Sequence, residues 1–292
     1  MDLAVPPAAV PFPGPGRPGP PQPGCTIPRV YFDARLLARS LRAPDLDDLR
    51  FFGVGGALVP ADDAATPAAA DAVRGAWEAI APAALRRLRR AGLLARAALG
   101  IHPRCIPWRG LEALLQELPD FLGRPGVAAI GEIGLVEGTP REERLLERQL
   151  ELAASLRLPV SIAVPWRHRE ALTRRLLARM RESEVEPGRV LLQGADSRTV
   201  KMIRACGHCA GLVLAAGEPA LDEAVRIVRA LGPEGLVLSS GAGEAGSDLL
   251  ALPRAAGRLA KAGLSDAVVR RVCGGNAMRW LGLDPKAMPG EP

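Results

Sequence analysis

The chain has 292 residues, of which 48% are hydrophobic and 24% charged, a balance that indicates a globular protein and excludes a disordered or fibrous one. No apolar run is long enough to cross a bilayer, and the N-terminus lacks the basic and apolar segments of a signal peptide, so we expect a cytoplasmic protein with no membrane contact. The net charge of +6 comes mainly from arginines spread along the chain, and with one tyrosine and five phenylalanines it is compatible with nucleic-acid binding without indicating it.

Proline and glycine dominate residues 1–28, which show no apolar periodicity. Such a segment cannot bury enough apolar surface to offset its chain entropy, so we predict a disordered or polyproline-like tail. A proline-rich ligand for some partner domain is the sharper alternative. We expect a single domain over residues 29–285 and a short second tail over residues 286–292.

Short, continuously apolar runs recur through this domain, as expected for parallel strands that are buried on both faces. They are RVYFDA (29–34), GVGGALVPA (53–61), RAALGIHP (96–103), GVAAIGEIGL (126–135), LPVSIAVP (158–165), RVLLQGAD (189–196), AGLVLAA (210–216) and GLVLSSG (235–241).

Amphipathic helical segments lie between these runs, and the clearest cover residues 140–157, 168–183, 218–232 and 248–263. The first of them has Pro140 in its first turn and acidic side chains early, as helix starts prefer. Eight strands, each followed by a helix, predict an α/β fold of the (β/α)8 TIM barrel type. A doubly wound open sheet is the alternative, but no Gly-x-Gly-x-x-Gly follows the first strand.

Cys206 and Cys209 form a Cys-x-x-Cys pair among five scattered cysteines. A redox pair would open a helix, and a zinc site would need a second pair of ligands at matching spacing. This pair instead closes a helical pattern and leads into a strand. We interpret it as two half-buried side chains at a helix–strand joint.

In a barrel of this kind the functional side chains lie at the C-terminal ends of the strands. In chain order these ends carry Asp33, Arg35 and Leu37; Pro60 and Asp62; His102; Glu132; Ala163, Trp166 and His168; Gly194 and Asp196; Ala215 and Ala216; and Gly241, Gly243 and Glu244.

Several stretches resemble the TatD family of metal-dependent hydrolases over nearly all of residues 29–284. They are AALGIHPRCIP, GVAAIGEIGLVEGTPREERLLERQLELAASLRLPV and CGGNAMRWLGL. The resemblance implies an amidohydrolase-like (β/α)8 barrel, with nuclease activity in some members. LGPEGLVLSSG and SDLLALP are similar to a branch whose members are not established nucleases.

The resemblance also implies a metal site with a defined set of ligands. The family holds one or two metal ions by His-x-His after the first strand, Glu after the fourth, His after the fifth and sixth, and Asp after the eighth. Such a metal lowers the pKa of a bound water so that hydroxide is available near neutral pH.

Most of these ligand positions hold other residues in this sequence. They are occupied by Arg35, Leu37, Ala163, Gly194 and Gly243, or by Glu244 in place of Gly243 if the correspondence shifts by one residue. Glu132 is retained, and so is Asp33, which precedes the His-x-His positions. The chain has only three histidines, His102, His168 and His208, so a four-histidine site cannot be built.

The first hypothesis is therefore a degenerate site without the metal chemistry and without a cofactor. Carboxylates that lose a dication from between them are costly to bury unless another cation replaces it. We predict that the Arg35 guanidinium neutralises Asp33 and Glu132. At Leu37 the metal ligand that the resemblance implies is missing, and no other residue replaces it.

The second hypothesis is an active divalent-metal-dependent hydrolase of the phosphodiester or nuclease type, with a rebuilt site. Asp33, His102 and Glu132, together with Asp196 or Glu244, would hold Mg²⁺ or Mn²⁺ through oxygen-rich ligands. Glu132 would then be the catalytic residue.

The third hypothesis is a barrel that binds a small molecule or a protein partner. Leu37, Ala163, Gly194 and Gly243 make the expected pocket smaller and more apolar, so a small organic ligand would fit. Trp166 is either an exposed wall of that pocket or a buried packing residue. The arginine-rich helices are either a partner surface or solvated faces, and the sequence does not indicate an oligomeric state.

Overall fold

Residues 31–61, 69–215 and 221–288 are described by the computed structural model. Eight strands form one parallel sheet in which each strand pairs with the next along the chain. The strands are β1 (Tyr31–Asp33), β2 (Val54–Pro60), β3 (Leu94–Leu99), β4 (Val127–Gly134), β5 (Val160–Ala163), β6 (Val190–Gln193), β7 (Cys209–Val213) and β8 (Leu236–Ser239). The tail expected over residues 1–28 lies outside the described residues, as do Asp62 and Ala216.

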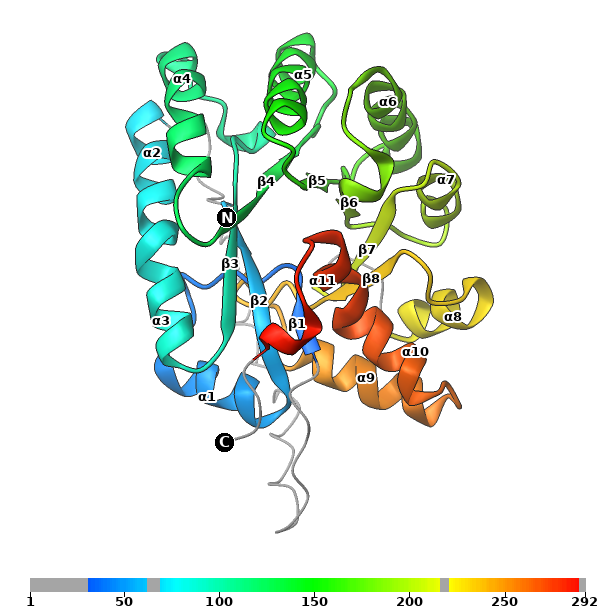
Figure 1. Ribbon diagram of the computed structural model, residues 1–292. Helices are drawn as coiled ribbons and strands as arrows, with labels where there is room; N and C mark the ends of the chain where they lie inside the picture. Colours follow the sequence, from blue (N-terminus) through cyan, green and yellow to red (C-terminus); the bar gives the residue numbers. More distant parts are fainter. Residues whose placement is uncertain (1–30, 62–68, 216–220, 289–292) are drawn as a thin grey trace, which may run out of the picture.

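The first and last strands meet just beyond their C-terminal ends. The backbone N–H of Gly241 donates to the Arg35 carbonyl at 3.1 Å, and the Leu37 N–H donates to the Ala242 carbonyl at 2.8 Å. These two bonds bring the end of β8 beside the end of β1, so the sheet curls into a ring (Figure 1). The fold is the (β/α)8 TIM barrel that the sequence predicts.

Helices surround the strands as an outer ring (Figure 1). They are α1 (Ala43–Phe51), α2 (Ala70–Glu78), α3 (Leu85–Arg90), α4 (Leu111–Leu122), α5 (Pro140–Ser155), α6 (Arg169–Glu182), α7 (Val200–Ala205), α8 (Leu221–Leu231), α9 (Ala251–Lys261), α10 (Asp266–Arg270) and α11 (Asn276–Trp280). The four helices predicted most clearly from the sequence correspond to α5, α6, α8 and α9. Within the described ranges, no helix is both long and apolar enough to cross a membrane.

The strands are buried on both faces, which is why their sequences are continuously apolar. Every residue of β2 and β8 is buried. One face packs on the helices, where the fully buried Trp77 of α2 donates its indole N–H to the Gly100 carbonyl at 2.9 Å. The other face fills the barrel, where Phe32 and Val237 belong to one apolar cluster with Met278 of α11. Helix α11 therefore covers one end of the barrel (Figure 1).

Strand β3 ends four residues earlier than the run 96–103 suggests. Beyond Leu99, the side chain of Gln149 from α5 replaces a neighbouring strand as the partner of Ile101. Its Oε1 accepts from the Ile101 N–H at 2.7 Å, and its Nε2–H donates to the Ile101 carbonyl at 3.2 Å. The chain thus leaves the sheet without losing backbone hydrogen bonds, and it delivers His102 beyond the end of β3.

The Cys206–Cys209 pair lies at a helix–strand joint, as the sequence indicates. Cys206 is the C-terminal cap of α7, and Cys209 is the first residue of β7. Both thiols are free and half-buried. The interpretation of this pair as two half-buried side chains at such a joint is therefore confirmed.

Candidate functional site

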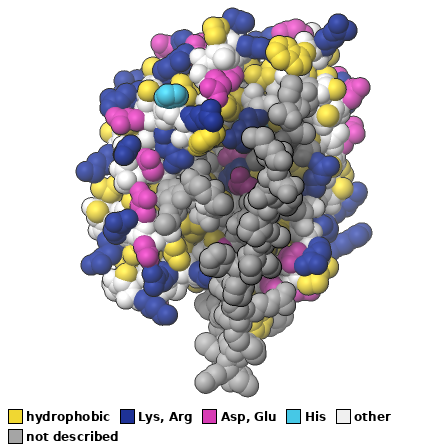
Figure 2. Space-filling view, turned by 180° about the vertical axis from the view of Figure 1, so that it is seen from behind, with side chains coloured by type: hydrophobic (Ala, Val, Ile, Leu, Met, Phe, Trp, Pro, Cys, Tyr) yellow, Lys and Arg dark blue, Asp and Glu magenta, His cyan; other side chains and the backbone are white. Residues whose placement is uncertain are grey.

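A charged cluster lies at the C-terminal side of the barrel, where Arg35 follows β1, Glu132 lies near the end of β4 and Glu244 follows β8. The Arg35 Nε–H lies 3.2 and 3.1 Å from the two carboxylate oxygens of Glu132, and Nη1–H donates to Glu244 Oε2 at 2.8 Å. The Glu132 side chain is 2% exposed and that of Arg35 12%, whereas Glu244 is 43% exposed. On the side of the molecule away from α11, acidic and basic side chains lie together in a hollow (Figure 2).

Asp33, the last residue of β1, is completely buried beside this cluster. Its Oδ1 accepts from the Ser240 N–H at 3.0 Å and from the Arg35 backbone N–H at 3.2 Å, and its Oδ2 accepts from the Ser240 hydroxyl. Burial raises the pKa of the Asp33 carboxyl from its ordinary 3.8 to about 6. The hydrogen bonds from Ser240 and the positive charge of Arg35 oppose that rise without cancelling it.

The predicted contact of the Arg35 guanidinium is present with Glu132, whereas Asp33 is held mainly by Ser240. The guanidinium contacts Glu132, as expected from its charge and its position at the end of β1. For Asp33, the Arg35 charge is the smallest of the influences on the pKa, and the carboxylate is held instead by the hydroxyl and backbone of Ser240. The two carboxylates differ because the side chain of Arg35 extends toward Glu132 on β4, while only its backbone N–H contacts Asp33.

His102 lies just beyond β3 and is 7% exposed. Its Nδ1 accepts from the Arg104 N–H at 3.2 Å, so the imidazole caps the short helical turn Pro103–Cys105. The structure thus places His102 at the mouth of the barrel, with one ring nitrogen committed to the local backbone.

The described residues at the ends of β5 and β6 are arranged differently. Ala163 is the last residue of β5, and Gly194 follows β6 with its N–H bonded to the Gly211 carbonyl at 3.0 Å. Asp196 accepts from the Thr199 N–H at 3.0 Å and from its hydroxyl at 2.8 Å, so it stabilises the turn that precedes α7. Trp166 is 56% exposed and lies under the guanidinium of Arg167, 4.5 Å from the ring centre. Trp166 is therefore exposed and not a buried packing residue, while its role as a wall of the pocket stays a prediction.

Leu37 and Gly243 lie where the β1 and β8 loops pack together. Gly243 has φ +95°, and a Cβ atom at this position would lie 2.1 Å from the Leu37 carbonyl oxygen. Leu37 itself is half-buried, and its side chain lines a cavity beside the mouth. The two loops can therefore pack this closely only because residue 243 is a glycine.

Two polar residues of the barrel were not predicted. Ser240 holds Asp33, and Gln193, the last residue of β6, donates from Nε2 to the Ala34 carbonyl at 3.1 Å and accepts from the Ser239 hydroxyl at 3.3 Å. Ser240 stands at the end of the run GLVLSSG, where a strand-end hydroxyl was visible in the sequence. The sequence does not show that this hydroxyl bonds to Asp33, because 207 residues separate the two positions.

The contacts join Asp33, Arg35, Glu132, Ser240 and Glu244 into one cluster, while Ala163, Trp166, Gly194 and Asp196 stay outside it. Across the described parts of the chain, no three His, Cys, Asp or Glu side chains form a group that could hold a metal ion. The chemistry that the cluster itself displays is the pairing of buried carboxylates with a guanidinium and a hydroxyl.

Comparison with known families connects this barrel to a group of enzymes. The family model of the TatD related DNases matches residues 58–229, which is more than half of the chain. The chain belongs to the TatD family. The resemblance that the sequence motifs carry is thereby confirmed.

The relatives of this TatD-family chain agree with that assignment. An uncharacterized metal-dependent hydrolase of Methanocaldococcus jannaschii is 27% identical over 210 residues, which cover 72% of this chain and 83% of that protein. The crystal structure of a TatD-like protein from Archaeoglobus fulgidus has a TM-score of 0.74 at 23% identity, covering 87% of this chain and all of that one. The phosphotriesterase homology protein from Escherichia coli, complexed with phosphate in its active site, has a TM-score of 0.67 at 17% identity, covering 87% and 99% of the two chains. These structures share the barrel fold.

Proposed function

We propose that this TatD-family barrel has exchanged the metal ion for an internal ion pair and acts by binding a ligand, not by metal-dependent hydrolysis. One observation carries the proposal, the contact of Arg35 Nε with both carboxylate oxygens of Glu132. Arg35 stands where the family resemblance expects a metal-binding histidine. Its guanidinium supplies, beside Glu132, the positive charge that a metal would supply.

The side chains of the alternative site do not fit a divalent cation. Both oxygens of Asp33 accept hydrogen bonds from Ser240, and His102 Nδ1 accepts one from the backbone. The carboxylates of Glu132 and Glu244 share the same guanidinium. A cation bound among these groups would lie against the positive charge of Arg35, which disfavours it.

The backbone at two expected ligand positions supports the same proposal. Gly194 has φ +84° and Gly243 has φ +95°, a region that residues with a side chain rarely adopt. At Gly243 a side chain would also collide with the Leu37 carbonyl. A histidine or an aspartate at these positions would require the loops to move. The proposed loss of the metal site therefore involves the loop backbone as well as the side chains.

Metal analysis combined with a hydrolysis assay tests the proposal. The purified full chain is incubated with Mn²⁺, desalted, and analysed for bound metal by mass spectrometry and for turnover of a chromogenic phosphodiester. We expect no stoichiometric metal, no turnover, and an unchanged melting temperature after treatment with a chelator. Arg35→Met serves as the comparison, because it removes the internal cation and leaves the carboxylates for a metal.

Metal binding with turnover would contradict the proposal. Stoichiometric Mg²⁺ or Mn²⁺ on the wild-type chain, with turnover that Glu132→Ala abolishes, would replace this proposal by an active metal-dependent hydrolase built on Asp33, His102 and Glu132. The exposed Glu151→Ala, outside the cluster, is the control for nonspecific effects of removing a carboxylate.

A further inference from the structure

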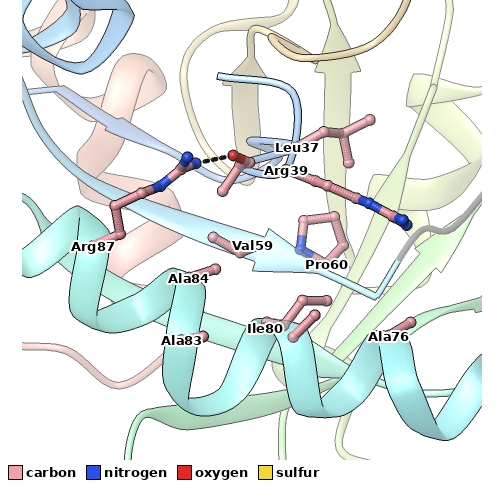
Figure 3. A pocket seen from close by; sticks show the side chains of 11 residues that line it. Leu37, Arg39, Val59, Pro60, Ala76, Ile80, Ala83, Ala84 and Arg87 are labelled. Carbon is pink, nitrogen blue, oxygen red and sulfur yellow. Dashed lines mark hydrogen bonds between the residues drawn. The ribbon is translucent and has the colours of Figure 1, made fainter. Parts of the chain in front are cut away.

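A cavity of about 280 Å³ lies beside the mouth of the barrel, between the end of β2 and the segment that runs from α2 to α3 (Figure 3). The described part of its lining is mostly aliphatic and includes no carboxylate. The described lining residues are Leu37, Ala38, Arg39, Val59, Pro60, Ala76, Ala79, Ile80, Ala83, Ala84 and Arg87. The volume is near the low end of the range of about 300–1,000 Å³ that is usual for small-molecule sites.

One wall of this cavity is the helical segment on either side of Ala81, where the backbone leaves the helical region with φ −114° and ψ 101°. Most residues that this wall turns toward the cavity are small, and Figure 3 shows Ala76, Ala83 and Ala84 along it. Ile80 projects from the same wall toward the end of β2 (Figure 3). The short side chains leave room that larger aliphatic side chains would fill.

The two arginines of the lining already have partners for their polar groups. The guanidinium of Arg87 donates to the carbonyls of Leu41 and Ala38, so it is turned toward the loop after β1 (Figure 3). Arg39 extends past Pro60 and has an interaction partner of its own. Long side chains of this kind cover apolar surface with their stems. The described lining therefore offers no free charged partner to a ligand, and a charge that is buried without a partner is costly.

We propose that this cavity binds a small uncharged molecule, whose aliphatic or aromatic body packs between Leu37, Val59 and Ile80. This inference rests on the binding role proposed above and names the site and the class of ligand. The removal of apolar surface from water is the main favourable contribution to such binding.

The loop after β1 connects this cavity with the charged cluster at the mouth of the barrel. Arg35 contacts Glu132, and Leu37, two residues further along the same loop, lines the cavity. The backbone of both residues is hydrogen-bonded to the loop after β8, at 2.8 Å from the Leu37 N–H and at 3.1 Å to the Arg35 carbonyl. Where the family resemblance implies an imidazole, Leu37 therefore contributes an apolar wall on a backbone that is already held in place.

A series of linear primary alcohols of increasing length tests the proposal by calorimetric titration of the full chain. Affinity is expected to rise up to roughly fourfold per carbon until the cavity is filled, which corresponds to about 0.8 kcal/mol for each buried methylene. The carboxylate and the amine of equal length are the charged comparisons. We expect each of them to bind at least about fivefold more weakly than the alcohol, since its charge would lose water without gaining a partner.

Two variants change the size of the cavity in opposite directions. Ala83→Leu fills it from an exposed helical position and is expected to lower the affinity for the alcohols by about tenfold or more. Ala72→Leu, on an exposed position of α2 outside the cavity, is its matched control and should bind as the wild type does. Ile80→Ala enlarges the cavity, so affinity should go on rising beyond the chain length at which it levels off in the wild type. A loss of folding could not produce that shift.

The outcomes distinguish this inference from the loss of metal chemistry. Absence of saturable binding across the alcohols, binding that Ala83→Leu leaves unchanged, or an acid or amine that binds as tightly as the alcohol would each overturn the site for an uncharged ligand. None of these results bears on metal content, which incubation with Mn²⁺ and mass spectrometry measure separately. Circular dichroism of each variant confirms that it is folded before titration.

Discussion

The two sides of the barrel mouth carry different kinds of side chain. On the β1–β4–β8 side, Asp33 and Glu132 remain buried as carboxylates, and Ser240 and Arg35 supply their partners. On the β5–β6 side, the positions of the expected histidines hold Ala163 and Gly194, which carry no polar side chain. The first side is a buried network of ions and hydrogen bonds, whereas the second has small residues at the expected ligand positions and a more exposed carboxylate, Asp196, beside them.

The two kinds of side chain make different demands on their surroundings. An imidazole replaced by alanine or glycine leaves no charge, so nothing in the surroundings needs to change. A buried carboxylate, in contrast, is costly until a cation or a hydrogen-bond donor contacts it. Arg35 and Ser240 are therefore expected to matter far more for stability than any residue at the ends of β5 and β6.

Removing the guanidinium should give the largest effect. Arg35→Met removes the guanidinium that contacts both carboxylate oxygens of Glu132, which is 2% exposed, and breaking a buried pair in this way costs about 3–5 kcal/mol of unfolding free energy. Urea unfolding measures the change. The double variant Arg35→Met with Glu132→Gln should recover most of the loss, because the buried negative charge at residue 132 is removed as well.

An exposed ion pair provides the matched control for this substitution. Arg258 pairs with Asp222 on the surface, so Arg258→Met should cost no more than about 1 kcal/mol. If both arginine variants lose the same unfolding free energy, the buried pair between Arg35 and Glu132 stabilises the protein no more than a surface ion pair does.

The second effect is a dependence of stability on pH that originates at Asp33. The pKa of this carboxyl rises from 3.8 to about 6 on folding, so between these values the folded protein binds a proton that the unfolded chain does not. The unfolding free energy should therefore fall as pH rises through this interval, by about 3 kcal/mol in total, since each tenfold change in proton affinity corresponds to about 1.4 kcal/mol.

Asp33→Asn should remove this contribution and flatten the profile between about pH 4 and pH 6. Urea unfolding at several pH values compares the two proteins. Asp222→Asn, which alters an exposed carboxylate, is expected to keep the wild-type slope. A slope that survives in Asp33→Asn would assign the pH dependence to another group.

The smallest effect is expected on the β5–β6 side. Asp196→Ala removes the acceptor for the Thr199 N–H and hydroxyl ahead of α7, a loss typical of helix-capping residues, at about 1 kcal/mol. Asp196→Asn keeps an acceptor oxygen and should cost less. Chemical denaturation of both variants decides the point, and a loss as large as that of Arg35→Met would abolish the contrast between the two sides.

Most of the barrel could be predicted from the sequence because its signals are local. Continuous apolar runs indicate strands that are buried on both faces, and the amphipathic segments between them indicate helices. The start of α5 shows how local the signal is, since Pro140 and the Thr139 cap lie within one turn. The end of β3 could not be predicted, because Gln149, from a helix 48 positions further along the chain, takes over the hydrogen bonds of Ile101.

The part of the site that could be predicted followed from the family resemblance and from the need to neutralise a buried carboxylate. The substitution of arginine for histidine at residue 35, beside a retained glutamate, was enough to predict the contact with Glu132. The partner of Asp33 was not predictable in this way. Ser240 looks like many other serines until the closure of the barrel brings it to the end of β1.

The sequence by itself therefore determined the barrel, its family and which residues stand at the expected ligand positions, because these depend on residue identities and on patterns within a few turns. Only the tertiary structure decided which carboxylate Arg35 contacts, which hydroxyl holds Asp33, and that Leu37 opens onto a cavity. These depend on directions of side chains and on loops joined across the ring, and chain positions more than 200 residues apart become neighbours only when the barrel closes.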